Sequence, residues 1–373
     1  MTEGPAPNHP PDEGVTATAA DADTRRGGAV GGDLRRAFSP FKPGADATRV
    51  AVAVVGETAP GQEVAPGQEA GAPAVLGTER GYWRTAWYEF RHDRLGMVGL
   101  VFVVLLILAA ILAPLIAPYS PNYQVPTGLT AAGNPRPPSS HFLLGTDPLG
   151  RDELSRLLFG ARISLVVGLG SAALGGVLGL VLGGVAGLFG GFADKLLMRL
   201  ADVILSFPIL LLATAVLAVT QPGVGSISII IGVGFGAYLG RVVYTQALTL
   251  RERDFVLAAR TAGVSRARIL ARHILPHVLP SVIVFSTLGV ATAIQLEAAL
   301  SYVGLGIHPP TASWGNMIAD GQNYMTTDVW LVLLPGIAII IAMLGFSLVG
   351  DGLRDALDPT LERTVQVKLG ALG

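Results

Sequence analysis

Seven arginines lie between residues 241 and 272, in a segment whose flanking stretches are long and apolar. The residues before Gly263 favour a helix, which glycine can end because it tolerates a positive φ. Ser265 can then cap a second helix. Arg266 and Arg268 follow in its first turn, where the helix dipole disfavours cations, so helix stability does not account for them. An external anionic partner could, either lipid headgroups or an acidic protein surface.

A histidine pair offers a second chemistry in the same segment. His273 and His277 stand four residues apart, a spacing at which two imidazoles could share a metal ion. The second helix is expected to end at Leu275, because Pro276 interrupts it, and no carboxylate lies nearby. We therefore expect no metal site here.

The composition places these residues in a membrane protein. Charged residues make up 14% of the chain, hydrophobic residues 51%, and the mean hydropathy is +0.54, whereas an average soluble domain is roughly 25% charged. The chain has no cysteine, which excludes disulfides and thiolate metal sites. Its only lysines, Lys42, Lys195 and Lys368, lie in no GxxxxGK[ST] phosphate-binding loop. The chain is therefore not expected to be an ATPase or another enzyme.

Apolar stretches near the required length of about 20 residues predict an all-α polytopic protein with six transmembrane helices. The uncharged stretch from Val203 is divided in two by the turn signal Gln221-Pro222-Gly223. The expected spans are Leu95 to Ile116, Ile163 to Phe189, Val203 to about residue 220, residue 224 to beyond Arg241, Val278 to Val303, and Val329 to Val349.

The placement of Lys and Arg sets the orientation of these spans. Sixteen lie in the flanks and loops on the side of the termini, and four lie on the other side. Both termini and the Arg-rich segment are therefore expected in the cytoplasm, and segments 117 to 162 and 304 to 328 outside.

Four parts of the chain follow from this layout. Residues 1 to 79 repeat Pro-Gly-Gln-Glu and are rich in Ala, Gly, Pro, Asp and Glu, so we expect a disordered cytoplasmic tail. Residues 80 to 160 hold the first span and an external loop. Residues 161 to 352 hold five helices and a cytoplasmic loop from 245 to 277, and residues 353 to 373 form a cytoplasmic tail.

Few polar side chains are expected within the membrane. Glu297 stands out, because a carboxylate in an apolar helix tends to face protein or a wet cavity. It could contact a substrate amine, together with Gln295 and Ser206 on a translocation pathway, or it could pair with a neighbour and fix helix packing. We favour packing for Glu297, and Ser206 is more typical of a helix end than of a site.

Two further patterns leave alternatives open. Glycines at 168, 175, 179, 183 and 187 allow a close helix approach, either within this bundle or to a second subunit. The external segment from Leu144 carries Asp147, Arg151 and Asp152, followed by Glu153 and Arg156. These charges could dock or gate an external protein, or they could pair with one another and hold the loop.

The Arg-rich segment resembles the signature loop of permease subunits of binding-protein-dependent ABC importers. That loop reads Glu-Ala-Ala, three residues, Gly, nine residues, Ile, one residue, Leu-Pro. The matching residues are Ala258, Ala259, Gly263, Leu275 and Pro276, whereas Leu257 replaces the Glu and His273 the Ile. Asp254 could partly substitute for the missing carboxylate. With Ser265, Arg266 and Arg268, these matching residues and Asp254 form the expected coupling loop.

A wider resemblance, from about Trp83 to Leu361, is to the second permease of dipeptide, oligopeptide and nickel importers. It is carried by LGTDPLGRDELSRLLFGARISL from Leu144, SFP at Ser206, ALSYVGLGIHPPTASWGNMI from Ala299, and GDGLRDALDP from Gly350. It implies a type I importer permease fold in the bacterial plasma membrane. It also implies three kinds of protein partner: a homologous second permease, ABC ATPase subunits and an extracytoplasmic solute-binding protein.

The resemblance also implies how the chain works. ATP and Mg²⁺ would be used by the partner ATPase, none being bound by this chain, and no nucleic acid would be involved. Short peptides are the expected cargo, with nickel as the alternative, since no His or carboxylate cluster marks a metal path. An ion-coupled secondary transporter is a distant alternative, because such proteins tend to show internal repeats and several buried ionisable groups. A purely structural scaffold would lack the docking loop.

Overall fold

The computed structural model describes residues 81–357, and within that range it contains helices and no strands. The tail expected over residues 1 to 79 lies outside the described residues. The α-helices are α2 (Tyr82–His92), α3 (Arg94–Ile116), α4 (Glu153–Phe189), α5 (Gly191–Leu205), α6 (Ile209–Val219), α7 (Val224–Arg251), α8 (Asp254–Thr261), α9 (Arg266–Ile269), α10 (Leu275–Tyr302), α11 (Trp314–Gly321) and α12 (Trp330–Leu357).

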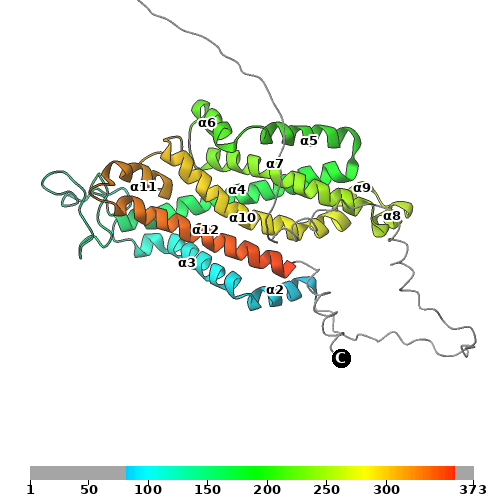
Figure 1. Ribbon diagram of the computed structural model, residues 1–373, viewed down its shortest axis with the longest axis horizontal. Coiled ribbons are helices and arrows are strands. Elements are labelled where there is room, and N and C mark those ends of the chain that lie inside the picture. The colour runs from blue at the N-terminus through cyan, green and yellow to red at the C-terminus, as the bar shows by residue number, and fades with distance from the viewer. Residues whose placement is uncertain (1–80, 358–373) are drawn as a thin grey trace, which may run out of the picture. The chain divides into compact units, whose positions relative to one another are not determined.

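The long helices run alongside one another, α5 and α6 lie along one side of them, and the other short helices lie at their two ends (Figure 1). The elements α2, α8 and α9 and the last turn of α12 lie at one end, which the arginine distribution marks as cytoplasmic. The segment before α4 and helix α11 lie at the opposite, external end. The segments expected in the cytoplasm thus lie at one end of the bundle, and the segments expected outside lie at the other.

Within residues 81–357, five helices are long and apolar enough to cross a membrane: α3, α4, α7, the continuous helix from Arg266 to Tyr302, and α12. A sixth crossing exists only if α5 and α6 together count as one span. Helix α4 begins ten residues earlier than the expected span, because Asp152 caps it and its Oδ2 accepts a hydrogen bond from the Ser155 backbone N–H at 2.8 Å. Residues 153 to 162 are therefore helical, not part of an external loop.

The expected third span is corrected. Helices α5 and α6 are bent by 88° at the Ser206-Phe207-Pro208 break. Pro208 cannot continue the hydrogen-bond ladder of α5 and disfavours a helical conformation at the residue before it. With 11 residues, α6 is too short to cross the hydrocarbon core alone. If α5 and α6 together form one crossing, that crossing starts at Gly191 and not at the expected Val203.

The expected end of the second loop helix at Leu275 is also wrong. Helix α9 passes through a π-helical segment, Leu270–Ile274, directly into α10. Pro276 lies in the first turn of α10 and is tolerated there, because the wider π turn upstream does not need its missing N–H. The cytoplasmic loop is thus continuous with a membrane helix.

Two of the expected domain boundaries fall inside helices. The boundary between residues 160 and 161 lies within α4, and α12 continues to Leu357 past the expected start of the C-terminal tail at 353. Residues 358 to 373 lie outside the described residues.

Helices α4 and α7 pack most closely, because both carry glycines at four-residue intervals. On α4 these are Gly175, Gly179, Gly183 and Gly187, and on α7 they are Gly232, Gly236 and Gly240. A Cβ added to Gly183 would lie 2.3 Å from the carbonyl oxygen of Gly240. The glycines of α4 from Gly175 onward therefore serve packing within this bundle, and Gly168 does the same against Ile294 of α10.

The glycine contact can be tested with a single methyl group. Gly183→Ala should lower the thermal midpoint of the detergent-solubilised protein, because overpacking against backbone costs about 1–3 kcal/mol. Gly336→Ala in α12 is the matched control, since a Cβ there meets no atom within 4 Å. Equal midpoints for the two variants would show that α4 and α7 do not need this close approach.

Candidate functional site

Helix α8 ends in a hydrogen-bond pattern that only a residue with positive φ allows. The Gly263 N–H donates to the Arg260 carbonyl at 3.0 Å, and the Val264 N–H donates to the Ala259 carbonyl at 3.0 Å. These two bonds form a Schellman motif, and Gly263 has φ +77°. The motif reverses the chain sharply between α8 and α9.

Apolar side chains hold this turn against the membrane helices. Val256 of α8, Ile269 of α9 and Ile274 of the π segment are completely buried. They belong to one apolar cluster with Val243 of α7 and Val278 of α10. Burying each such side chain contributes about 1.5–3 kcal/mol, so the helical turn is fixed on the bundle rather than hinged from it.

The opposite face of the turn is open. Of the predicted coupling residues, Ala259 and Leu275 are half-buried, and the exposed ones are Asp254, Ala258, Gly263, Ser265, Arg266, Arg268 and Pro276. Leu257, which stands where the signature has Glu, is 46% exposed beside Ala258. Ala259 and Leu275 pack on the buried cluster, whereas the exposed members of the predicted set are small, apolar and basic side chains together with the acidic Asp254.

Ser265 occupies the N-cap position of α9, but its side chain makes no capping hydrogen bond, so the expected cap is wrong in that respect. The histidines nearby pack with an aromatic ring. The Phe255 ring stacks on the His277 ring with centroids 5.3 Å apart, and His277 Nδ1 lies 2.6 Å from the His273 carbonyl oxygen. The Phe255 ring therefore joins α8 to the start of α10, while the backbone contact holds the His277 ring on its own helix.

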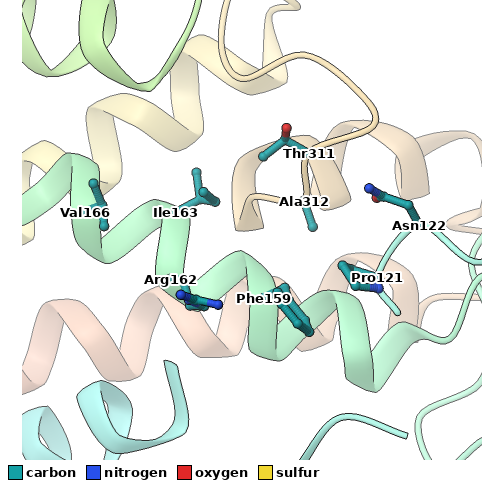
Figure 2. A pocket seen from close by; sticks show the side chains of 8 residues that line it. All are labelled: Pro121, Asn122, Phe159, Arg162, Ile163, Val166, Thr311 and Ala312. Carbon is teal, nitrogen blue, oxygen red and sulfur yellow. The ribbon is translucent and has the colours of Figure 1, made fainter. Parts of the chain in front are cut away.

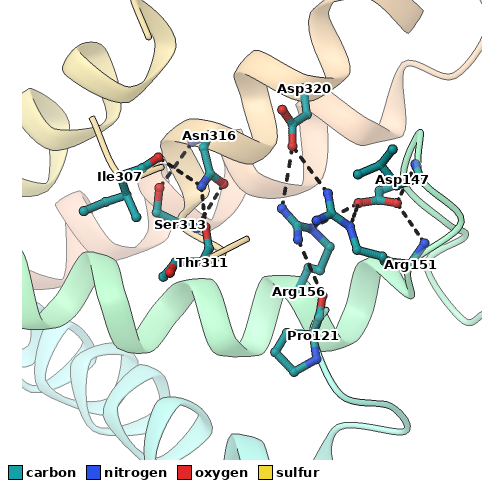
Figure 3. Close-up of polar contacts among 10 residues, drawn as sticks. Pro121, Asp147, Arg151, Arg156, Ile307, Thr311, Ser313, Asn316 and Asp320 are labelled. Carbon is teal, nitrogen blue, oxygen red and sulfur yellow. Dashed lines mark hydrogen bonds and ion pairs between the residues drawn. The ribbon is translucent and has the colours of Figure 1, made fainter. Parts of the chain in front are cut away.

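At the external end, the predicted charges form a buried network (Figure 3). One Asp147 oxygen accepts hydrogen bonds from the backbone N–H groups of Leu149 and Arg151, and the other contacts Arg151 Nε at 2.5 Å and Arg156 Nε at 3.3 Å. Both guanidinium groups also reach Asp320 of α11, at 3.7 and 3.6 Å. The network ties the external loop and α4 to α11.

This geometry is that of self-pairing, one of the two alternatives left open by the sequence. Asp147 and Arg151 are at most 4% exposed, and the Asp152 side chain caps α4. Asp320 is the member that sequence reasoning missed, because it lies far along the chain and carries no local signal. Burial raises the pKa of its carboxyl, against the opposing effect of the Arg156 and Arg151 charges. The docking or gating role of Asp147, Arg151 and Asp152 stays a prediction.

The predicted pathway residues do not lie together. Glu297 is fully buried, and its two oxygens accept hydrogen bonds from Ser164 of α4 at 3.0 Å and from Ser301 of α10 at 2.8 Å. It joins two helices, which is the packing role favoured above. Gln295 and Ser206 are exposed, and the Ser206 hydroxyl donates to the Val203 carbonyl at 2.7 Å.

Among the grooves on the described part of the chain, two bear on the predicted sites. One, of about 290 Å³, lies at the external end and is lined by Arg162 and Phe159 of α4 and by Asn122 and Thr311 (Figure 2). The other, of about 470 Å³, lies beside the bend between α5 and α6 and carries no charged side chain; its lining includes Phe207, Phe235, Tyr238, Phe285 and Thr292.

Comparison with known proteins assigns this architecture. Residues 179–363 match the family described as "Binding-protein-dependent transport system inner membrane component". Residues 81–135 match "N-terminal TM domain of oligopeptide transport permease C". The chain is 41% identical over 281 residues to the oligopeptide transport system permease protein OppC of Bacillus subtilis, covering 75% of this chain and 90% of that protein. The chain belongs to this permease family.

Other members of the family are equally similar. Identity is 41% to the di/tripeptide transport system permease protein DppC of Pseudomonas aeruginosa, over 74% of this chain and 91% of that protein. It is also 41% to the glutathione transport system permease protein GsiD of Escherichia coli, over 75% of this chain and 91% of that protein. The permease is thus a multi-pass protein of the bacterial plasma membrane, and its all-α polytopic fold is confirmed.

The ion pairs of Asp147 are buried, whereas the pair of Asp202 with Arg241 is exposed, and this difference can be tested. Asp147→Asn should destabilise the permease by about 3–5 kcal/mol, since it leaves two buried guanidinium groups without their central carboxylate. Asp202→Asn, which breaks the exposed pair of α5 with Arg241 of α7, should cost at most about 1 kcal/mol.

Thermal midpoints and membrane levels of the two variants, measured side by side, check this expectation. A smaller loss for Asp147→Asn than for Asp202→Asn would contradict a structural role for the external network.

Proposed function

We propose that this chain is the transmembrane permease subunit of an ATP-driven importer that moves short peptides from an external binding protein into the cytoplasm. The observation that carries the proposal is the turn formed by α8 and α9. Buried Val256 and Ile269 fix it on the bundle, while Arg266 and Arg268 project from it at the arginine-rich end. A permease of this family needs such an element to receive movement from an ATPase.

The partner ATPase supplies the nucleotide chemistry in this proposal. ATP and Mg²⁺ are used there, because the sequence has no phosphate-binding loop. The exposed face of α8 offers Leu257 and Ala258 to a groove on the ATPase, and the two arginines of α9 offer positive charge to an acidic rim. Asp254, at the first turn of α8, stands where it would contact the same partner.

Peptides are the cargo best supported. The names of the three relatives above refer to oligopeptides, di- and tripeptides, and glutathione, and these are all peptides. The charge-free groove beside the α5–α6 bend suits a pathway for peptides of varied side chains, because it offers apolar and aromatic contacts without a fixed charge. Hydrogen bonds from two serines hold the Glu297 carboxylate between α4 and α10, away from that pathway. Nickel is the alternative cargo.

A second, homologous permease and an external binding protein complete the proposed assembly. The large exposed side chains along α4, such as Val166, Val177 and Val181, leave a membrane-facing surface that lipid or the second permease can cover. The binding protein would approach the end that carries the external loop and α11.

The coupling proposal predicts uncoupling by charge reversal. Arg266→Glu with Arg268→Glu should weaken ATPase association by about tenfold, because like charges then face each other, and peptide uptake should fall accordingly. Gly263→Pro should act in the same way, since proline cannot adopt φ +77° and removes the N–H bonded to Arg260. Co-purification of the ATPase and uptake in proteoliposomes measure both.

Arg354→Glu is the matched control for charge, because Arg354 is exposed at the same end of the bundle but lies on α12. It should leave ATPase association and uptake near normal. Normal peptide uptake by the Arg266 and Arg268 variant, with the same amount of permease in the membrane, would contradict the docking role of α9.

The cargo proposal is tested by uptake of a labelled tripeptide and of nickel in cells from which the permease is deleted and then restored. We expect tripeptide uptake to be lost and recovered with nickel uptake unchanged. Loss of nickel uptake alone would move the permease to the nickel branch of its family.

A further inference from the structure

Helix α2 has three distinct sides, and one of them packs on the membrane helices. Ala86 and Phe90 are buried against α12 and α10, in contact with Leu353, Leu357 and Val284 among others. The Tyr82 hydroxyl also donates to the Leu357 carbonyl at 3.1 Å, which fixes the start of α2 to the end of α12. The helix is therefore held in a defined rotation, and its other two sides must face something else.

One of those sides combines aromatic rings with arginine. Trp83, Trp87 and Arg91 follow one another at four-residue intervals and so lie in a line along the helix, and Arg84 lies next to Trp87. Trp83 is 52% exposed and Trp87 53% exposed. Neither arginine makes an ion pair with an acidic residue of the described chain.

The remaining side is polar. Glu89 and His92 lie on the flank away from the two tryptophans, and the Tyr88 ring lies beside the His92 ring on that flank. A helix with an aromatic and basic flank beside a polar flank is typical of one that lies at a membrane surface. Water would meet the polar flank, and the tryptophans would enter the boundary between headgroups and acyl chains.

The position of α2 in the chain agrees with this. A single residue, Asp93, separates it from α3, whose N-terminus Asp93 caps through hydrogen bonds from the Leu95 and Gly96 N–H groups at 3.1 and 2.8 Å. Helix α3 is a candidate membrane span of 23 residues, about the thickness of the hydrocarbon core. Residues just before its first turn must therefore lie at the level of the headgroups.

We infer that the Trp83, Trp87, Arg84 and Arg91 flank of α2 binds anionic phospholipid headgroups of the cytoplasmic leaflet. The indole rings lie at the depth that tryptophan prefers in membranes, and the guanidinium groups pair with lipid phosphates. The cytoplasmic leaflet carries the anionic lipids that attract such arginines. Bound lipid thereby stabilises the contact of α2 with α12 and fixes the depth of α3.

A cysteine-free chain makes the depth of α2 measurable with spin labels. Cysteine is introduced singly at Trp83, Trp87 or Glu89 of the full chain, which is then assembled into its transporter in nanodiscs of phosphatidylglycerol and phosphatidylcholine. The natural cysteine-free chain gives the background. Labels at 83 and 87 should collide more with oxygen than with a water-soluble nickel chelate, and the label at 89 should show the reverse.

Two results would overturn the inference. Equal access of the nickel chelate to all three labels would place α2 in water. Labels at 83 and 87 that are shielded from both reagents would show that a protein subunit, not lipid, covers this flank.

The headgroup chemistry is tested separately by exchanging the two arginines. A fluorophore at position 87 is quenched with brominated phosphatidylglycerol or brominated phosphatidylcholine, and the ratio gives the local preference for anionic lipid. Arg84→Gln and Arg91→Gln should each lower that preference by about fivefold. Arg199→Gln on α5, also exposed, is the control and should leave it unchanged. An unchanged ratio in the Arg84 and Arg91 variants would contradict phosphate binding.

Discussion

The backbone contact between α4 and α7 is the constraint on which the rest of the permease depends. Glycines at matching intervals let the two helices approach until side chains no longer fit between them. In a membrane the hydrophobic effect does not drive helices together, so this packing has to come from shape. Helix α4 begins in the external charge network, and α7 leads directly into α8. The α4–α7 pair therefore connects the external charge network with the cytoplasmic turn of α8 and α9.

Charge is distributed differently at the two ends, and the difference follows from what each end has to do. At the external end Asp147, Arg151 and Arg156 are buried and satisfy one another, with Asp320 completing the group. Removing one member would leave the others unpaired in a poorly hydrated site, so the group holds α11 in place. At the cytoplasmic end the arginines of α9 are exposed and available to a partner.

Sequence reasoning succeeded where the signal is local and periodic. Apolar runs gave the long membrane helices, and Gly263 gave the turn after α8, because a positive φ is a requirement of one residue. It failed where the outcome depends on three-dimensional neighbours. Asp320 reaches Arg151 and Arg156 from far along the chain. Helix α5 begins at Gly191, before the expected start at Val203, because Lys195 and Arg199 end the apolar run without ending the helix. Ser206 and Gln295 carry no signal that separates an exposed position from a pathway.

The π segment joins the cytoplasmic turn to a membrane helix without a break. The sequence suggested a helix break at Pro276, which would have separated the second helix of the loop from α10. Instead one helical path runs from Arg266 to Tyr302 and carries Glu297, which joins α10 to Ser164 of α4. A displacement of α9 by an ATPase would thus reach the Glu297 contact along a single helical path, which passes through the π segment Leu270–Ile274.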